Sequence, residues 1–426
     1  MHQDSQPLKP LLSSQISPKE KLITSTYFFL QGVGSQLPFQ ALLSTLDFFT
    51  KQYPHAPLPV GFTFPAANSI SSTFMIFFMI LLSKKFSLNS RVAGSNYILI
   101  LLLSCLPILA SLLPDSSLSF WINLSLLFLT GFFFTAASGT VAGLGALFPA
   151  EYRSKNAMGC SCAGVFTNVI RAVILAILPA DSAKGEILGV YIYYTVSGLI
   201  LGVCIISHYV FVRTDYAKQI LKGEEERASE NLNETKEDCE AGTRKLRDWE
   251  EVKESLKQLW EGFKEIKLLS FVMVVVMMQF SMLFPGLVFA KKVELLEDAW
   301  KNTVILLIFN VCDVLGKFAT LFRGLYNKNT PLYVALFRMS FFVIFITTAM
   351  TQNVPIIDEN WFFFLSIIVL GLTGGFFVGS LFVMMPEYAS EKRKETSGFL
   401  GIMCLMMGIT IGSNLSIPLA TYLNLK

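Results

Sequence analysis

The chain has 426 residues, of which 53% are hydrophobic and 15% are charged, and its mean hydropathy is +0.55. A soluble fold of this length cannot bury so much apolar surface, whereas a surface that faces lipid need not be polar. The net charge of +3 is close to neutral and argues against a nucleic-acid partner.

Long apolar runs recur along the chain. One spanning helix needs about 20 mainly apolar residues. Eleven such runs are present, at about 22–49, 62–83, 93–113, 119–148, 157–179, 187–212, 267–290, 302–322, 331–352, 361–386 and 397–422. The first run begins near Leu22, behind a polar tail and without a small-residue cleavage site, so we expect a retained helix. We therefore predict an all-α polytopic membrane protein with eleven transmembrane helices.

A polar stretch at about 213–266 divides the apolar runs into six and five. We predict a cytoplasmic tail over 1–21, helices 1–6 within 22–212, a cytoplasmic loop over 213–266, and helices 7–11 within 267–426. In the loop, residues 224–240 are highly charged and lack apolar periodicity, which is typical of disorder. Near 246–263, apolar residues such as Trp249, Trp260 and Phe263 recur at three- and four-residue spacing, which predicts an amphipathic surface helix.

Positive charges set the expected orientation. If the N-terminus is cytoplasmic, the short inner segments hold thirteen Lys and Arg residues and the outer segments hold six. This excess has the sign of the positive-inside rule, and it alternates from loop to loop. We expect a cytoplasmic N-terminus, an extracellular C-terminus, a place in the plasma membrane and a monomer.

Ionisable residues within the apolar runs are candidate functional residues, because charge is costly at membrane depth. Asp313 and Lys317 lie four apart in the eighth run, so they share a helix face and can pair, either for structure or for function. Arg171 lies in the middle of the fifth run and must find a carboxylate, a carbonyl or water. Asp47 lies near an outer end, where we expect it to be solvated, and we expect His208 to be structural.

The sequence contains no recognisable set of catalytic or metal-binding residues. The three histidines are far apart in sequence, no Gly-Lys-Ser phosphate loop occurs, and no cysteine pair has metal-ligand spacing. We therefore predict no catalytic residues, no metal and no cofactor.

Short motifs follow one another through the membrane part in a definite order. They are Leu37-Pro38-Phe39-Gln40-Ala41-Leu42-Leu43 with Asp47-Phe48-Phe49-Thr50, Gly143-Leu144-Gly145-Ala146-Leu147-Phe148-Pro149 with Met158-Gly159, Phe284-Pro285, Phe309-Asn310 with Asp313, Leu315-Gly316 and Lys317, Arg338, and Glu395-Thr396-Ser397-Gly398 with Gly408 and Gly412. In this order and spacing they resemble the equilibrative nucleoside transporter family, as do the count of eleven runs and the long loop after the sixth.

Four residues depart from the family's usual pattern. Phe39 stands where the family usually has Trp, and Gln40 where it has Asn. Cys160 stands where a Gln usually contacts the nucleoside, and Lys317 replaces Arg. Lys is a point charge on a flexible stem and cannot present the planar fork of Arg. These changes fall at positions that the family uses to recognise base and ribose.

The resemblance implies a fold like the major facilitator superfamily, with six-helix and five-helix halves around a central cavity, and facilitated diffusion of nucleosides or nucleobases. Such a site needs a few polar groups among apolar walls. Phe39 and Leu43 would wall the base, and Gln40, Asp313 and Lys317 would offer donors and acceptors. Cys160 would occupy the contact position of the usual Gln. Arg171 has no counterpart in the family's pattern, and we keep it as a candidate intramembrane charge partner.

Two other classes of function remain open. One is a transporter of another small polar solute, such as a sugar, either proton-coupled or facilitative. The other is a non-transporting receptor or scaffold, although a scaffold has no need of charges within its spans. A membrane-embedded enzyme is the weakest alternative, because the chain lacks a recognisable catalytic set.

Overall fold

The computed structural model describes residues 17–82, 87–178 and 183–222, and most of 257–423, with short gaps at 258, 292, 294–295, 321, 323, 325–326, 328, 351–353, 358 and 391–392. The segment 224–240, which we predict to be disordered, lies outside the described residues. So do most of the tail 1–21 and residues 246–256 of the predicted surface helix.

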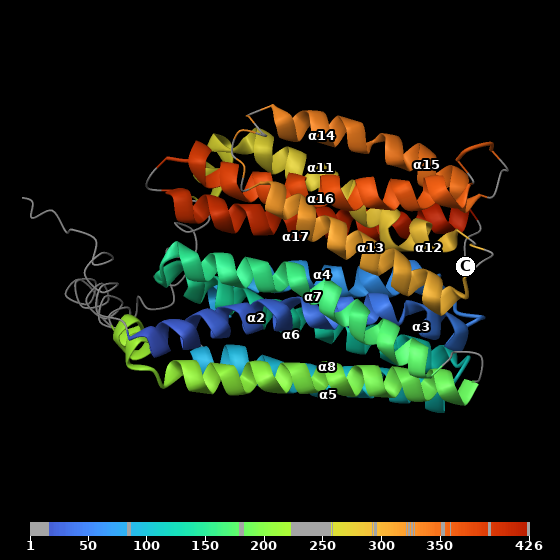
Figure 1. Ribbon diagram of the computed structural model, residues 1–426, viewed down its shortest axis with the longest axis horizontal. Helices are drawn as coiled ribbons and strands as arrows, with labels where there is room; N and C mark the ends of the chain where they lie inside the picture. Colours follow the sequence, from blue (N-terminus) through green and yellow to red (C-terminus); the bar gives the residue numbers. More distant parts are fainter. Residues whose placement is uncertain are drawn as a thin grey trace, which may run out of the picture.

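The elements of the structure are helices throughout the described residues (Figure 1). The N-terminal half contains α2 (Pro18–Ser44), α3 (Leu46–Gln52), α4 (Val60–Leu82), η1 (Ser90–Gly94), α5 (Ser95–Leu112), α6 (Ser117–Leu147), α7 (Ala150–Ile177) and α8 (Ala183–Val212). The C-terminal half contains α11 (Lys267–Met282), η2 (Leu283–Leu287), α12 (Val288–Ala290), α13 (Asp298–Ala319), α14 (Thr330–Arg338), α15 (Ser340–Ala349), α16 (Asn360–Tyr388) and α17 (Lys394–Tyr422).

Many of these helices have the length and composition of membrane spans. Within the described residues, nine helices or runs of consecutive helices are long and apolar enough to cross a bilayer. The other two predicted runs coincide with α2 and α4, which carry many polar residues. Gln31 on α2, for example, is buried and donates a hydrogen bond to the carbonyl oxygen of Cys204 on α8 (2.7 Å), which explains how an interrupted apolar run can lie within the bundle. The described part of the chain is thus helical throughout its regular structure, with many helices of membrane-spanning length and composition.

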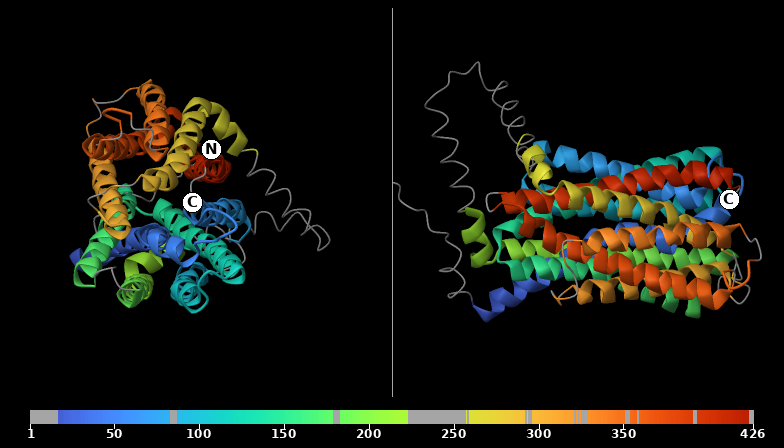
Figure 2. Two further views of the ribbon diagram at one scale, coloured as in Figure 1. Left: turned by 90° about the vertical axis from the view of Figure 1, so that its right-hand side faces the viewer. Right: turned by 90° about the horizontal axis from the view of Figure 1, so that it is seen from above.

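The helices form two bundles that lie side by side (Figures 1 and 2). In the N-terminal half α2 packs on α7 and α8, and α4 and α5 pack on α6. In the C-terminal half α13 packs on α16, and α11 packs on α17. The two halves meet along two seams, one between α4 and α17 and the other between α7 and α13.

The apolar cores show at which end the halves are joined. One cluster, which we call the shared cluster, combines Leu43 and Phe62 of the N-terminal half with residues of the C-terminal half that include Phe284, Leu287 and Phe309. It lies toward the end that carries α3 and α12 (Figure 1). Toward the opposite end, two further clusters each draw all their described members from one half. The halves are therefore packed together through apolar side chains at the α3 end.

Two helix breaks shape this end of the molecule. α2 contains Pro38 and ends at Ser44, and Thr45 turns the chain into α3 with φ −122° and ψ 17°. In η2, Phe284 has an extended backbone (φ −117°, ψ 131°), as expected for a residue before proline, because the ring of Pro285 disfavours the helical conformation there. Both breaks lie beside the shared cluster and change the direction of the chain there, one between α2 and α3 and the other between α11 and α12.

A short helical segment precedes α11. Residues 259–265 are helical, and Leu259 and Phe263 pack against the core of the C-terminal half. Trp260 is 58% exposed, and Arg393 binds Glu261 at 2.7 Å. This part of the predicted amphipathic segment covers the end of the C-terminal half.

Candidate functional site

The ion pair predicted in the eighth apolar run lies on α13. The Nζ atom of Lys317 is 2.5 Å from Oδ2 of Asp313, one helical turn away. The Lys317 side chain is 34% exposed and that of Asp313 is 19% exposed, so neither is sealed within the helix packing. Two charged groups that are paired but still reachable can exchange partners with a bound solute.

α7 of the other half faces this region across the seam. Gly164 on α7 contacts Asn310 on α13 so closely that a Cβ atom on Gly164 would lie 2.3 Å from Oδ1 of Asn310. One turn earlier, Cys160 shares a hydrogen bond with the hydroxyl of Ser35 on α2 (3.2 Å). α7 and α13, which carry Cys160 and Lys317, are in contact across this seam.

The three predicted residues of α2 lie where that helix meets the C-terminal half. Leu43 is 3% exposed and belongs to the shared cluster, and Phe39 is half-buried against the same cluster. Gln40 is also half-buried, and its Oε1 atom is buried without a hydrogen-bond partner in the described structure. Pro38 precedes them within the helix.

A stack of three phenylalanines was not predicted as part of the site. The rings of Phe284 and Phe309 are stacked with centroids 4.6 Å apart, and Phe280 stacks on both at 5.4–5.5 Å. Phe39 packs against the same cluster from the other half. The signal available in the sequence was the four-residue spacing of Phe280 and Phe284, which places both rings on one helix face. The three rings therefore form one continuous aromatic stack.

Asn310 was also missed as a site residue, although it belongs to the motif that carries the family resemblance. It is 6% exposed, and its Nδ2 atom has no hydrogen-bond partner among the described residues. Buried polar atoms are normally paired, so an unpaired one calls for an explanation. Asn310 offers a free donor and Gln40 a free acceptor, on α13 and α2, which are in contact.

Arg171 lies elsewhere, inside the N-terminal half. Its Nη2 atom is 3.3 Å from Oδ2 of Asp47, and both side chains are 1% exposed. The expectation that Asp47 is solvated is therefore wrong, because the turn at Thr45 leads into α3 with Asp47 buried and within reach of the Arg171 guanidinium. Arg171 is eleven residues beyond Cys160, about 16 Å along the helix axis. It is a charge partner for Asp47 and does not lie beside the α13 pair.

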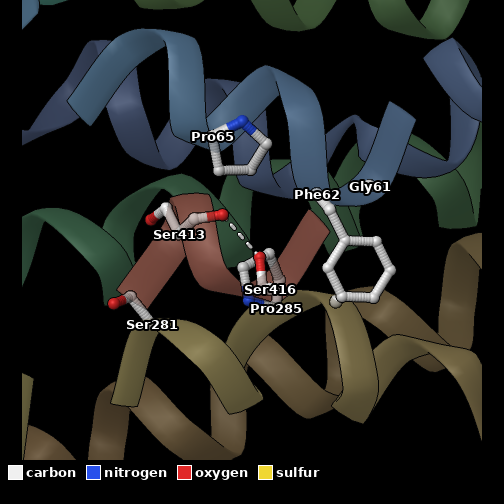
Figure 3. A pocket seen from close by; sticks show the side chains of 8 residues that line it. Gly61, Phe62, Pro65, Ser281, Pro285, Ser413 and Ser416 are labelled. Atoms are coloured by element: carbon white, nitrogen blue, oxygen red, sulfur yellow. Dashed lines mark hydrogen bonds between the residues drawn. The ribbon is translucent and has the colours of Figure 1, made fainter. Parts of the chain in front are cut away.

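A small pocket lies at the other seam, where α4, α17, α11 and η2 meet (Figure 3). About 160 Å³ of space there is not filled by atoms, and part of it is open to the surroundings. Its lining residues are Gly61, Phe62, Pro65, Ser281, Pro285, Gly286, Ser413 and Ser416. The hydroxyl groups of Ser281 and Ser416 donate to backbone carbonyls of their own helices (2.8 and 2.7 Å), so they are already satisfied. We interpret this pocket as a packing gap between the halves.

His208 is buried and structural in its contacts. Its Nδ1 atom is 3.2 Å from the hydroxyl of Tyr27, and its Nε2 atom is 3.0 Å from Oδ1 of Asn89. Within the described residues there is no group of three or more His, Cys, Asp or Glu side chains that could hold a metal ion.

A comparison with models of protein families shows which family the chain belongs to. Residues 125–420, more than half of the chain, match the family model described as nucleoside transporter. The chain belongs to the nucleoside transporter family. The matched region contains α7, the α13 pair and the phenylalanine stack, and α2 precedes it.

Curated relatives of this family match over nearly the whole chain. Equilibrative nucleotide transporter 1 of Arabidopsis thaliana is 23% identical over 91% of this chain and 83% of its own length. Equilibrative nucleoside transporter 2 of Homo sapiens is 22% identical over 91% of this chain and 95% of its own length. These relatives match a larger share of the chain than the family model does.

Solved structures show the same fold. The nucleoside transporter NupG covers 95% of this chain and 91% of its own, with a TM-score of 0.54 at 12% identity. A D-xylose–proton symporter covers 95% and 93%, with a TM-score of 0.66 at 11% identity. At such low identity the likeness concerns the fold alone.

Proposed function

We propose that this protein carries nucleosides or nucleobases across a membrane by facilitated diffusion, through alternating access to a site between its two halves. The observation that carries the proposal is the family match over residues 125–420, which contains the Asp313–Lys317 pair. The protein acts as a transporter and not as an enzyme, and it needs no cofactor.

The chemistry of the site suits a nucleoside. A nucleoside is neutral and has an aromatic face with several hydroxyl groups, so its site combines apolar walls with a few directed polar groups. In this proposal the ring of Phe39 and the phenylalanine stack flank the base, together with Leu43. Gln40 and Asn310 use their unpaired amide atoms to bind it. Asp313 and Lys317 bind hydroxyl groups or the base edge, and Cys160 closes the site from α7.

Alternating access requires that the halves separate at one end while they close at the other. The shared cluster supports a state that is closed at the α3 end, because Leu43 and Phe62 are packed into the C-terminal half. Opening there would pull these side chains out of the cluster. Phe62 contacts Gly286 so closely that a Cβ atom on Gly286 would lie 2.0 Å from the Phe62 ring, which makes this contact a tight closure.

We further propose the membrane arrangement that the charge pattern predicts. Eleven spans, six before the loop and five after it, place the N-terminus and the 213–266 loop in the cytoplasm and the C-terminus outside the cell. The α3 end is then extracellular, and the shared cluster closes the outer side. The protein acts as a monomer in the plasma membrane, with the lipid bilayer around it.

Uptake into proteoliposomes tests the function. Radiolabelled adenosine, hypoxanthine and glucose are offered with and without a pH gradient. We expect uptake of adenosine or hypoxanthine that stops at equal concentrations and does not depend on the gradient. Glucose uptake would favour a sugar transporter, gradient-driven accumulation would favour proton coupling, and no uptake of any solute would favour a receptor or scaffold.

A further inference from the structure

Arg338, the last residue of α14, is a fully buried cation with incomplete hydrogen bonding. It is 0% exposed. Its Nη1 atom donates to the carbonyl oxygen of Leu370 (2.9 Å) and to Oγ1 of Thr373 (2.8 Å), and its Nε atom donates to Oε1 of Gln279 (3.3 Å). Its Nη2 atom has no partner among the described residues. Because Arg keeps its charge in proteins, burial requires a negative charge nearby.

The N-terminal half also contains a buried arginine, and comparison with it shows that Arg338 lacks a carboxylate partner. Arg171 has its own carboxylate, that of Asp47, at 3.3 Å. Arg338 forms no such direct ion pair within the described part of the chain. Beyond its first turn, α13, which packs on α16, carries one acidic residue, Asp313. Asp313 is therefore the candidate counter-charge of a second cation, in addition to Lys317.

α16 contacts both Asp313 and Arg338. A Cβ atom on Gly375 would lie 2.0 Å from the carbonyl oxygen of Asp313, and one on Gly374 would lie 3.4 Å from Nη1 of Arg338. Two successive glycines thus contact the two residues without a side chain of their own. The close packing of α13 on α16 holds the turn that carries Asp313 against the same stretch of α16 that Arg338 contacts.

The charges of this region do not balance in pairs. Asp313 contributes one negative charge, and Lys317 and Arg338 contribute two positive charges. In the structure the carboxylate is bonded to Lys317, and Nη2 of Arg338 is left without a partner. A carboxylate has two oxygens and can accept from both cations, or from either one alone.

We propose that Arg338 is a positioning residue that takes over the Asp313 carboxylate when Lys317 binds substrate. The Asp313 side chain turns from Nζ of Lys317 toward Nη2 of Arg338, and the donors of Lys317 are released to an acceptor atom of the nucleoside, such as a carbonyl oxygen, a ring nitrogen or a hydroxyl oxygen. No proton is transferred, so the exchange is compatible with facilitated diffusion. The proposal rests on the proposed function, because it requires Lys317 to contact the substrate.

A double-mutant cycle tests this exchange. Adenosine binding is measured by equilibrium binding to the purified full-length protein, and the melting temperature reports folding. Lys317→Gln removes the substrate contact and weakens binding. Arg338→Gln leaves Lys317 held by Asp313 and also weakens binding, by about tenfold or more, while the double variant binds within about threefold of Lys317→Gln alone.

Two further variants separate positioning from structure. Gln279→Leu removes a hydrogen-bond partner of Arg338 but keeps the charge, so the melting temperature falls and affinity stays near that of the parent. Arg338→Lys keeps the charge and retains most of the affinity. If Arg338→Gln does not fold, the same cycle is run with Arg338→Lys. The smaller loss of adenosine affinity caused by Arg338→Lys must also vanish when Lys317 is replaced by Gln.

The outcomes are distinct. If Arg338→Gln lowers the affinity by the same factor in the parent and in the Lys317→Gln variant, Arg338 acts through folding alone. The proposed exchange would then be wrong, while the proposal of nucleoside transport would stand. A parent protein that binds neither adenosine nor hypoxanthine would overturn the proposed function and this inference with it.

Discussion

Arg171 on α7 and Asp47 on α3 form an ion pair at 3.3 Å in which each side chain is 1% exposed. The pair fixes the segment that follows the break at Thr45 against the helix that carries Cys160 and Gly164. It therefore anchors α3 to α7, the helix that meets α13 across the seam.

Asp47→Asn should destabilise the N-terminal half, because it leaves Arg171 buried without a counter-charge. Removal of one partner of a buried pair typically costs about 3–5 kcal/mol. The melting temperature of the detergent-solubilised protein measures the effect. The matched control is Lys218→Gln, which breaks the ion pair with Asp215; these side chains are 60% and 84% exposed, so the cost should be about 0–1 kcal/mol. Equal melting temperatures for the two variants would contradict this account of the pair.

Gly164→Ala should impair transport more than folding. The added Cβ atom would lie 2.3 Å from Oδ1 of Asn310, across the seam between the halves. Overpacking of this kind typically costs about 1–3 kcal/mol, and here the cost falls on the states in which α7 and α13 are in contact. Nucleoside uptake measures it. Gly143→Ala on α6 is the control, since its Cβ atom would meet nothing within 4 Å. If both variants transport like the parent, close contact at this seam is not needed in the cycle.

Phe39→Ala should weaken substrate binding while the amount of folded protein stays near normal. Stacking of a base on an aromatic ring is typically worth about 1–3 kcal/mol, so the KM for adenosine uptake should rise about 5- to 150-fold. Phe39→Trp, which keeps an aromatic face, should bind well. An unchanged KM together with a loss of folded protein would make Phe39 a packing residue of the shared cluster.

The sequence predicts the helices better than it predicts their partners. Each apolar run corresponds to one helix or to consecutive helices, because length and hydropathy are local properties. The expectation for Asp47 failed because its distance from the end of a run indicates depth along the membrane normal and not which neighbour it faces. Arg171 was expected to find a carboxylate, a carbonyl or water, and the structure shows that it is the carboxylate of Asp47 on α3.

The candidate site shows the same limit. The pairing of Asp313 with Lys317 follows from helix spacing, and the structure has it. The phenylalanine stack joins α11, η2 and α13, and the exposed fractions of Gln40 and Asn310 depend on how the halves meet. Such long-range contacts leave no periodic signal in the sequence. Whether these residues bind substrate stays a prediction.

The orientation is tested with two single-cysteine changes at exposed lysines. Lys51 lies on α3, and Lys21 near the start of α2. In intact cells an impermeant maleimide should label Lys51→Cys, and should label Lys21→Cys after permeabilisation alone. The parent protein gives the background from its native cysteines. Labelling in the reverse pattern would invert the topology and place the shared cluster on the cytoplasmic side.

The central claim is that nucleosides cross through a site that contains the α13 pair. The most direct test is the initial rate of radiolabelled adenosine uptake by proteoliposomes that contain either the parent or the Asp313→Asn, Lys317→Gln double variant, with equal amounts of folded protein. The double change removes both charges of the α13 pair together, so neither partner is left without the other, and it removes the polar site as well. We predict downhill uptake by the parent and a rate at least about 100-fold lower for the variant, which corresponds to about 2.7 kcal/mol. A double variant that transports adenosine as fast as the parent would contradict the claim.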